Sequence, residues 1–299
     1  MAMVAGGQRC AAGEDLLVLQ SLWAMERRHP DGFERTLEEN IALIVEGDFD
    51  GISAHCYDPN RVRTIGDAIR GTGLAVEGMC FPQSVEDLKP ALDCAAQFGV
   101  LHLNIQPDVR LRRIEECVPL IEGWMRLAEQ VDHPVYFETH RNRMTTDLFF
   151  TLDLLDRLPE MPLLADLSHY LVGREFWYPV CEEDEAMVFE ILDQSWAFHG
   201  RVASREQVQI EISFPQHQIW LDLFLRWWDY GFRSWSRRAE PGRKLSFACE
   251  IGPRPYAITD REQNDTTDRW QEALRLKAYV RGLWATIVEE EASSARVDT

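Results

Sequence analysis

Four residues whose side chains can bind a metal ion each follow a short apolar run in the second half of the chain. The runs are 135–137, 163–165, 196–198 and 245–249, and the residues that follow them are Glu138, Asp166, His199 and Glu250. Short runs rich in aromatic and branched residues are typical of buried strands. If the strands are parallel, their carboxyl ends lie at one edge of the sheet, where ligand sites form. We therefore expect the four side chains to converge.

The residue types indicate which chemistry such a cluster supports. Three carboxylates and one imidazole at one point would repel each other unless a divalent cation neutralised them. An oxygen-rich site with one nitrogen suits Mn, Mg, Co or Zn, so the sequence predicts one divalent ion held by Glu138, Asp166, His199 and Glu250. Such an ion stabilises the negative charge that develops when a proton leaves a carbon next to a carbonyl. Glu138 and Glu250 are then the candidate acid/base pair, and which of them is the base stays open.

Other polar and aromatic side chains near the expected strand ends are candidates for contact with a substrate. An imidazole three residues after a metal ligand favours a polar contact in the site, and basic residues directly after Glu138 either pair with nearby acids or receive a carboxylate or phosphate. An indole at a strand end could stack on a sugar ring, although packing is the commoner role of a lone tryptophan. The candidates are His140, Arg141, His169, Arg201, Arg205, Trp23, His55 and Gln106.

The rest of the chain supplies the elements that must position these residues. Further strands are expected at 15–23, 51–56, 74–80 and 101–106. Helices are expected at 33–46, 60–71, 85–98, 113–131, between the strands at 135 and 163, and at 183–195, 217–238 and 266–289. Eight strands alternating with eight helices predict an α/β fold, a single (β/α)8 TIM barrel. An open doubly wound sheet is the alternative, but no GxGxxG motif follows the first strand.

The barrel domain is predicted to span residues 15–290. Residues 1–14 are small and polar and are expected to be a disordered N-terminus, and residues 291–299 are expected to be an acidic disordered tail. The connection 207–216 is long for a loop on the carboxyl face, so it is a candidate lid.

Composition limits the partners of the protein. A formal charge of −19 disfavours nucleic acid, and a small neutral or weakly anionic substrate fits better. Seven cysteines without a CxxC pair indicate free thiols in a reducing compartment, so we expect a cytoplasmic protein. No apolar stretch approaches the length that crosses a membrane, so no membrane partner is expected. A homo-oligomer is possible, and Trp227 and Trp228 are expected in the core or at a dimer contact.

The segments FETH, ADLSH, FHGRVASR and CEIGP resemble the xylose isomerase-like superfamily of TIM barrels. This superfamily comprises sugar phosphate isomerases and epimerases together with AP endonuclease family 2. The resemblance covers the second half of the chain, and the first half fits through its order of strands and helices. It implies metal binding by Glu138, Asp166, His199 and Glu250.

Two branches of that superfamily imply further residues. The ketose 3-epimerase branch has a substrate-binding histidine and arginine at the offsets of His169 and Arg205. It also has a substrate-binding glutamate at the position that is Met144 here. The endonuclease branch needs additional histidines for a cluster of zinc ions, and this chain has 8 histidines, few of them near strand ends.

These observations predict a divalent-metal-dependent sugar isomerase or epimerase that transfers a proton through an enediolate. The alternative on the same scaffold is a lyase or dehydratase that expels a β-substituent from a keto-inositol or keto-glycoside. An AP endonuclease-like hydrolase and a non-catalytic binding barrel rank lower, because the chain is acidic and the expected site contains paired acids.

Overall fold

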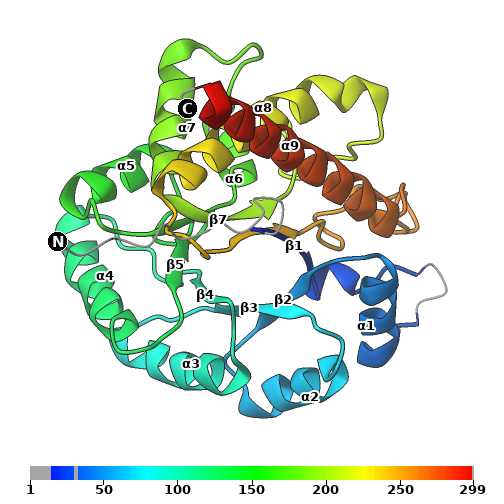
Figure 1. Cartoon of the computed structure of the whole chain (residues 1–299), viewed down its shortest axis with the longest axis horizontal. Helices are drawn as coiled ribbons and strands as arrows, with labels where there is room; N and C mark the ends of the chain where they lie inside the picture. The colour runs from blue at the N-terminus through cyan, green and yellow to red at the C-terminus, as the bar shows by residue number, and fades with distance from the viewer. Residues whose placement is uncertain (1–14, 30–32, 298–299) are drawn as a thin grey trace.

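The apolar runs of the sequence form eight strands that pair in chain order and close into a parallel barrel (Figure 1). The computed structural model describes residues 15–29 and 33–297. The strands are β1 (Leu16–Ser21), β2 (Gly51–His55), β3 (Ala75–Cys80), β4 (His102–Ile105), β5 (Val135–Glu138), β6 (Leu163–Ala165), β7 (Ser195–Gly200) and β8 (Leu245–Cys249). Parallel pairing of β1 with both β2 and β8 closes the barrel. The predicted (β/α)8 TIM barrel is confirmed.

Helices follow the strands and cover the outside of the barrel (Figure 1). Polar caps begin several of them: Thr36 and Glu39 form a capping box, and the Ser84 hydroxyl accepts a hydrogen bond from the backbone of Asp87. The helices are α1 (Leu37–Glu46), α2 (Pro59–Ile69), α3 (Val85–Phe98), α4 (Ile114–Ala128), α5 (Leu148–Arg157), α6 (Ser168–Arg174), α7 (Glu182–Asp193), α8 (Gln218–Arg238) and α9 (Arg269–Val297). None of the described helices is long and apolar enough to cross a membrane.

The structure differs from the predicted elements at three places. The short helix α6 follows β6, so two helices rather than one separate β6 from β7. The first strand ends at Ser21, and Trp23 lies in the 3-10 helix η2 (Trp23–Met25). Helix α9 continues to Val297, into the segment 291–299 that was expected to be disordered, and Ser236 donates a hydrogen bond to Glu291 there. Residues 1–14, expected to be disordered, lie outside the described residues.

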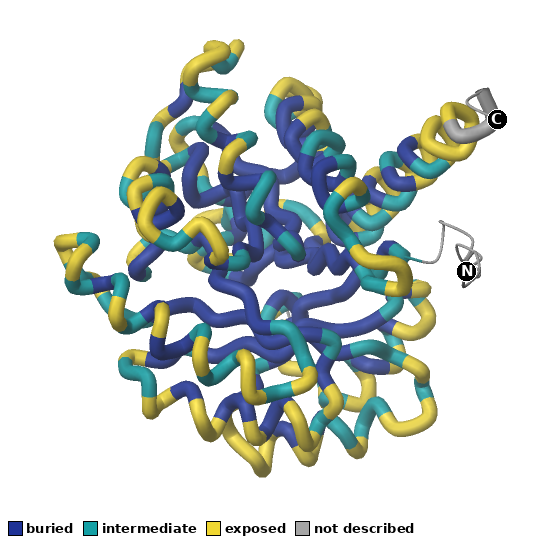
Figure 2. Tube along the Cα trace, turned by 60° about the vertical axis from the view of Figure 1, so that its left-hand side comes forward, coloured by how far each residue is buried: buried dark blue, intermediate teal, exposed yellow. Residues whose placement is uncertain are grey.

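The interior of the barrel contains both apolar and polar side chains. Tyr136, Leu164 and Ala197 pack together in the barrel interior. On β3, Glu77 lies between its register partners Ser53 on β2 and His102 on β4, and the ring of His102 is 4.9 Å from that of Tyr136. All three of these polar side chains are buried. The strands are the most continuously buried part of the chain (Figure 2).

A second apolar layer fills the space between the strands and the surrounding helices. Trp124 on α4 and both Trp227 and Trp228 on α8 are fully buried there. The ring of Trp228 meets Phe247 of β8 edge to face, with centroids 5.0 Å apart. The two adjacent tryptophans therefore belong to the core.

Candidate metal centre

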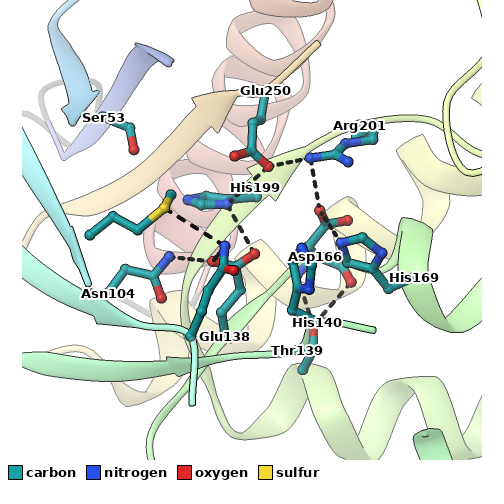
Figure 3. A network of polar contacts seen from close by, with 12 residues as sticks. Ser53, Asn104, Glu138, Thr139, His140, Asp166, His169, His199, Arg201 and Glu250 are labelled. Atoms are coloured by element: carbon teal, nitrogen blue, oxygen red, sulfur yellow. Dashed lines mark hydrogen bonds and ion pairs between the residues drawn. The ribbon is translucent and has the colours of Figure 1, made fainter. Parts of the chain in front are cut away.

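Three of the four predicted ligands converge at the carboxyl end of the barrel (Figure 3). Glu138 is the last residue of β5, His199 lies near the end of β7, and Glu250 directly follows β8. Nδ1 of His199 is 3.6 Å from Oε1 of Glu138 and 3.4 Å from Oε2 of Glu250. One ligand atom from each of the three residues lies within 4.8 Å of the others. All three side chains are buried.

Neighbouring amides fix the carboxylate of Glu138. The side-chain amide of Gln106 donates to Oε2 of Glu138 at 3.0 Å, and Asn104 donates to the same oxygen. The hydroxyl of Thr145 donates to the backbone carbonyl of Glu138. Oε1 has no hydrogen-bond partner among the described residues. Glu138 therefore presents one free oxygen toward His199.

Asp166 lies beside this trio but faces a different partner. Its Oδ1 accepts hydrogen bonds from the backbone nitrogen of Ser168 at 3.0 Å and from the hydroxyl of the same residue at 2.5 Å. Its Oδ2 is 3.6 Å from Nη2 of Arg201 and 3.4 Å from Nε2 of His169. Arg201 also donates from Nη2 to Glu250. The guanidinium thus lies between the Asp166 and Glu250 carboxylates (Figure 3).

Burial and charge shift the pKa values of this cluster in different directions. Burial would lower the pKa of His199, but the charges of three surrounding glutamates outweigh it and hold that pKa well above its ordinary value. Burial raises the pKa of Asp166 to about 6, against the attraction of Arg201. The pKa of Glu250 is held well below its ordinary value despite burial, chiefly by the charge of Arg201. Burial lowers the pKa of His169 well below its ordinary value, so this imidazole is neutral.

A divalent cation fits the residues that meet here. Oε1 of Glu138, Nδ1 of His199 and Oδ2 of Asp166 are buried and have no hydrogen-bond partner among the described residues. Unpaired buried polar atoms are costly, and two carboxylates with one imidazole are ligands of Mg, Mn, Co and Zn. Glu138, His199 and Glu250 are the residues that would hold the ion. Asp166 belongs to neither set of described ligand atoms that lie within 4.8 Å of one another, so its role as the fourth ligand remains a prediction.

Several of the predicted substrate-binding residues surround the centre. The rings of His140 and His169 are 4.0 Å apart, and their ligand-type nitrogens lie within 4.8 Å of a Glu138 oxygen. The guanidinium carbons of Arg201 and Arg141 lie 4.6 and 5.1 Å from the ring centroid of Tyr256. These cationic and aromatic side chains therefore adjoin the acidic centre.

Trp23 and His55 lie on the β1 and β2 side of the same face. Trp23 meets Tyr256 edge to face at 5.2 Å, and a Cβ at Gly252 would lie 2.2 Å from the indole, so a glycine is needed beside this ring. His55 packs against Tyr57 and Phe81. Trp23 and His55 line one small cavity.

Arg205 makes its contacts elsewhere. Its guanidinium stacks on Trp177 at 3.5 Å, and its Nε donates to the backbone carbonyl of Glu175 at 2.9 Å. Both partners belong to the connection after α6. Within the described part of the chain, these contacts of Arg205 do not reach the four predicted ligands, so its role in substrate binding remains a prediction.

The connection 207–216, expected as a lid, is packed against the barrel. Gln209 exchanges two hydrogen bonds with the backbone of Gly252, at 3.0 and 2.7 Å. The backbone nitrogen of Ile212 donates to Glu272 of α9 at 2.7 Å. These bonds anchor the segment to the loop after β8 and to α9. The segment therefore does not stand away from the barrel as a separate lid.

Sequence reasoning missed three residues that shape the centre: Glu77, Asn104 and Tyr256. A signal existed for two of them. Glu77 interrupts the apolar strand of residues 74–80, and Asn104 is the middle of three polar residues at alternate positions, 102, 104 and 106, which mark one polar face of a strand. Tyr256 lies on a loop, where spacing carries no such signal.

The sequence matches no family model and no curated protein. Solved structures similar in fold include the following two. A xylose isomerase-like TIM barrel protein from Mycobacterium smegmatis in complex with magnesium has a TM-score of 0.60 and 12% identity, over 93% of this chain and 99% of the other. An AP endonuclease, family 2, from Brucella melitensis has a TM-score of 0.51 and 13% identity, over 80% of this chain and 93% of the other. The chain therefore has the fold of the xylose isomerase-like TIM barrels.

Proposed function

We propose that the protein is a divalent-metal-dependent isomerase or epimerase that acts on a small sugar or keto-polyol. The observation that carries this proposal is the convergence of Glu138, His199 and Glu250 around buried, unpaired ligand atoms. A buried acidic centre at the carboxyl end of a TIM barrel is the usual place and composition of a metal-assisted active site.

The reaction follows from what the side chains can hold and move. A bound divalent ion would polarise a substrate carbonyl and offset the negative charge of an enediolate. One of Glu138 and Glu250 would take a proton from a substrate carbon, and the other would return a proton to the neighbouring carbon in an isomerase or to the opposite face of the same carbon in an epimerase. Which of them acts first stays open. Arg201 keeps Glu250 ionised, because its guanidinium donates directly to that carboxylate. The neutral His169 can donate to or accept from a substrate hydroxyl.

The surroundings favour a polar substrate without a large negative charge. The chain carries a formal charge of −19, and carboxylates outnumber cations at the centre. Trp23 and Tyr256 provide aromatic faces of the kind that pack on the apolar face of a sugar ring. We propose a cytoplasmic location, because the buried free thiols fit a reducing compartment.

The test combines metal analysis with isotope exchange. Purified protein should contain about one divalent ion per chain, and after its removal with a chelator Mn²⁺ or Mg²⁺ should restore it. In D₂O the loaded protein should exchange a C–H proton of a keto-sugar from a substrate panel. Glu250→Gln should lose the exchange while keeping part of the metal. Absence of both metal binding and exchange in the parent protein would refute the proposal.

A second function, a lyase or dehydratase, is favoured by one specific observation. His140 and His169 form a pair of imidazoles beside Asp166, with ring centroids 4.0 Å apart. Burial lowers the pKa of both, so a neutral imidazole of this pair could accept the proton removed from the substrate carbon and, as the imidazolium so formed, pass it to the departing hydroxyl. Mass spectrometry of the product would distinguish the two reactions. A dehydratase removes water from the substrate, whereas epimerisation conserves mass.

A further inference from the structure

We infer that Glu77 is a positioning residue that holds the His199 ring so that Nδ1, and not Nε2, is the metal-binding nitrogen. This inference rests on the proposed metal centre and adds to it a residue from the first half of the chain. Glu77 is the third of the six residues of β3, and its side chain is fully buried.

The contact between the two residues is direct. Oε1 of Glu77 is 2.7 Å from Nε2 of His199, and both side chains are fully buried. The hydroxyl of Ser53 donates to the same oxygen at 2.7 Å. Nε2 of His102 lies 3.4 Å from the other oxygen of Glu77, but it is also 2.7 Å from the hydroxyl of Ser246. Glu77 therefore has a carboxylate oxygen fixed between Ser53 and His199.

The burial of Glu77 determines which of the two residues donates the hydrogen bond. A carboxylate without solvent contact needs hydrogen-bond donors, because an unpaired buried charge is strongly destabilising. His199 meets that need only when its Nε2 carries a proton and donates it to Glu77. The bond assigns one ring nitrogen to Glu77 and leaves the other, Nδ1, to the opposite side of the ring.

The opposite side of the ring is where the candidate ligands lie. Nδ1 has no hydrogen-bond partner among the described residues, and oxygens of Glu138 and Glu250 are 3.6 and 3.4 Å away. A metal-binding histidine commonly donates its second ring N–H to a carboxylate, which fixes the tautomer and the ring orientation. Glu77, His199 and the proposed cation would have this arrangement of carboxylate, histidine and metal.

A purely structural role for Glu77 makes different predictions. If the carboxylate only pairs with His199 to stabilise the barrel, its replacement lowers stability but leaves metal affinity and the ligating nitrogen unchanged. A positioning role changes both, because a glutamine amide can either accept from Nε2–H or donate to a bare Nε2. Glu77→Gln therefore no longer selects one tautomer, whereas the size and shape of the side chain are kept.

The experiment measures Zn²⁺ affinity by competition with a chelator and the His199 tautomer by ¹⁵N NMR of the Zn²⁺-loaded protein. In the parent protein we expect a protonated Nε2 and a metal-bound Nδ1. Glu77→Gln should bind Zn²⁺ about 10- to 100-fold more weakly and show a mixture of His199 forms. Ser53→Ala keeps the carboxylate and removes a neutral donor, so its effect on affinity should be smaller. Glu211→Gln, which changes a buried glutamate outside the centre, should leave affinity unchanged.

The outcomes separate this inference from the proposed function. If the parent protein binds no divalent ion, the metal centre and the role of Glu77 both fall. If it binds Zn²⁺ through Nε2 of His199, or if Glu77→Gln matches the parent in affinity and tautomer, only the role of Glu77 falls. The parent spectrum alone decides the ligating nitrogen, so the inference remains testable even if Glu77→Gln folds poorly.

Discussion

Arg201 donates a hydrogen bond from Nη2 to Glu250, and the same nitrogen lies 3.6 Å from Asp166. The arginine is buried, and its Nε and Nη1 have no hydrogen-bond partner among the described residues. A fixed positive charge is thus part of the acidic centre. It balances part of the charge of the carboxylates that a divalent ion would also balance.

Replacement of Arg201 by Met should therefore make stability depend on metal. Without metal, two buried carboxylates lose their cation, which should cost about 3–5 kcal/mol of unfolding free energy. Added Mn²⁺ should restore more stability in Arg201→Met than in the parent, because the ion supplies the missing positive charge. Urea unfolding with and without Mn²⁺ measures both values.

Arg205→Met is the matched control: its partners Glu175 and Trp177 lie on the surface, so a loss of at most about 1 kcal/mol without extra metal rescue is expected. Equal rescue in the two variants would contradict this role of Arg201.

Glu138→Gln should abolish tight metal binding through the orientation of its amide. Asn104 and Gln106 both donate to Oε2 of Glu138, so the amide oxygen must occupy that side and the NH₂ group must replace Oε1. An NH₂ group cannot ligate a cation, so affinity should fall by more than about 100-fold, beyond the loss typical of an outer-shell change. Equilibrium dialysis against Mn²⁺ measures it. Unchanged binding in this variant would remove Glu138 from the ligand set, provided that Glu211→Gln also binds normally.

The buried His102 should make the metal-free protein less stable in acid. Burial lowers its pKa from 6.5 to about 4. Because the unfolded chain then binds more protons between these two values, unfolding becomes easier as pH falls through this window, and above it no cost remains. The contribution at pH 4.5 is about 2–3 kcal/mol. Urea unfolding of the parent and His102→Gln at pH 7 and 4.5 isolates it: the parent should lose more stability than the variant. Equal losses would show that His102 charges freely inside the barrel.

The thiols should differ in reactivity according to burial. Cys56, Cys80, Cys94, Cys117 and Cys249 are buried and free, whereas Cys181 is exposed. Burial raises the pKa of the Cys56 thiol to about 12 and of Cys117 to about 11, which lowers the fraction of reactive thiolate. In a Cys10→Ser background, one thiol should react rapidly with Ellman's reagent, and Cys181→Ser should remove that phase. Denaturant should expose the remaining five. Rapid reaction of further thiols in the native protein would contradict the described packing.

The fold could be predicted because its signals are local. Most strands are short segments dominated by apolar residues, and helices begin at caps such as Thr36 and Ser84. The convergence of Glu138, His199 and Glu250 follows from the same logic, since parallel strands deliver the residues after them to one edge. Helix α6 escaped prediction because a segment of 7 residues is too short to show helical periodicity.

The contacts within the site could not be predicted in the same way. Glu77 meets His199 across 122 positions of sequence, and only the closed barrel brings β3 and β7 face to face. Arg201 and Arg205 both follow His199, and the offset of Arg205 favoured it as the substrate contact, whereas it is Arg201 that contacts the acidic centre. Their partners decide it: Glu250 attracts the first, and Trp177, on the connection after the unpredicted α6, stacks with the second.

The division of the barrel into its two halves has a consequence for folding. All four predicted ligands come from β5 to β8, whereas the side chains that orient them, Glu77 and Asn104, come from β3 and β4. Closure also requires β1 to pair with β8, near the other end of the chain. Such distant pairing is slow to form, because a long loop must close before any contact rewards it. A chain emerging during synthesis would therefore acquire its ligands last, and high affinity for the ion would arise only as the two halves dock.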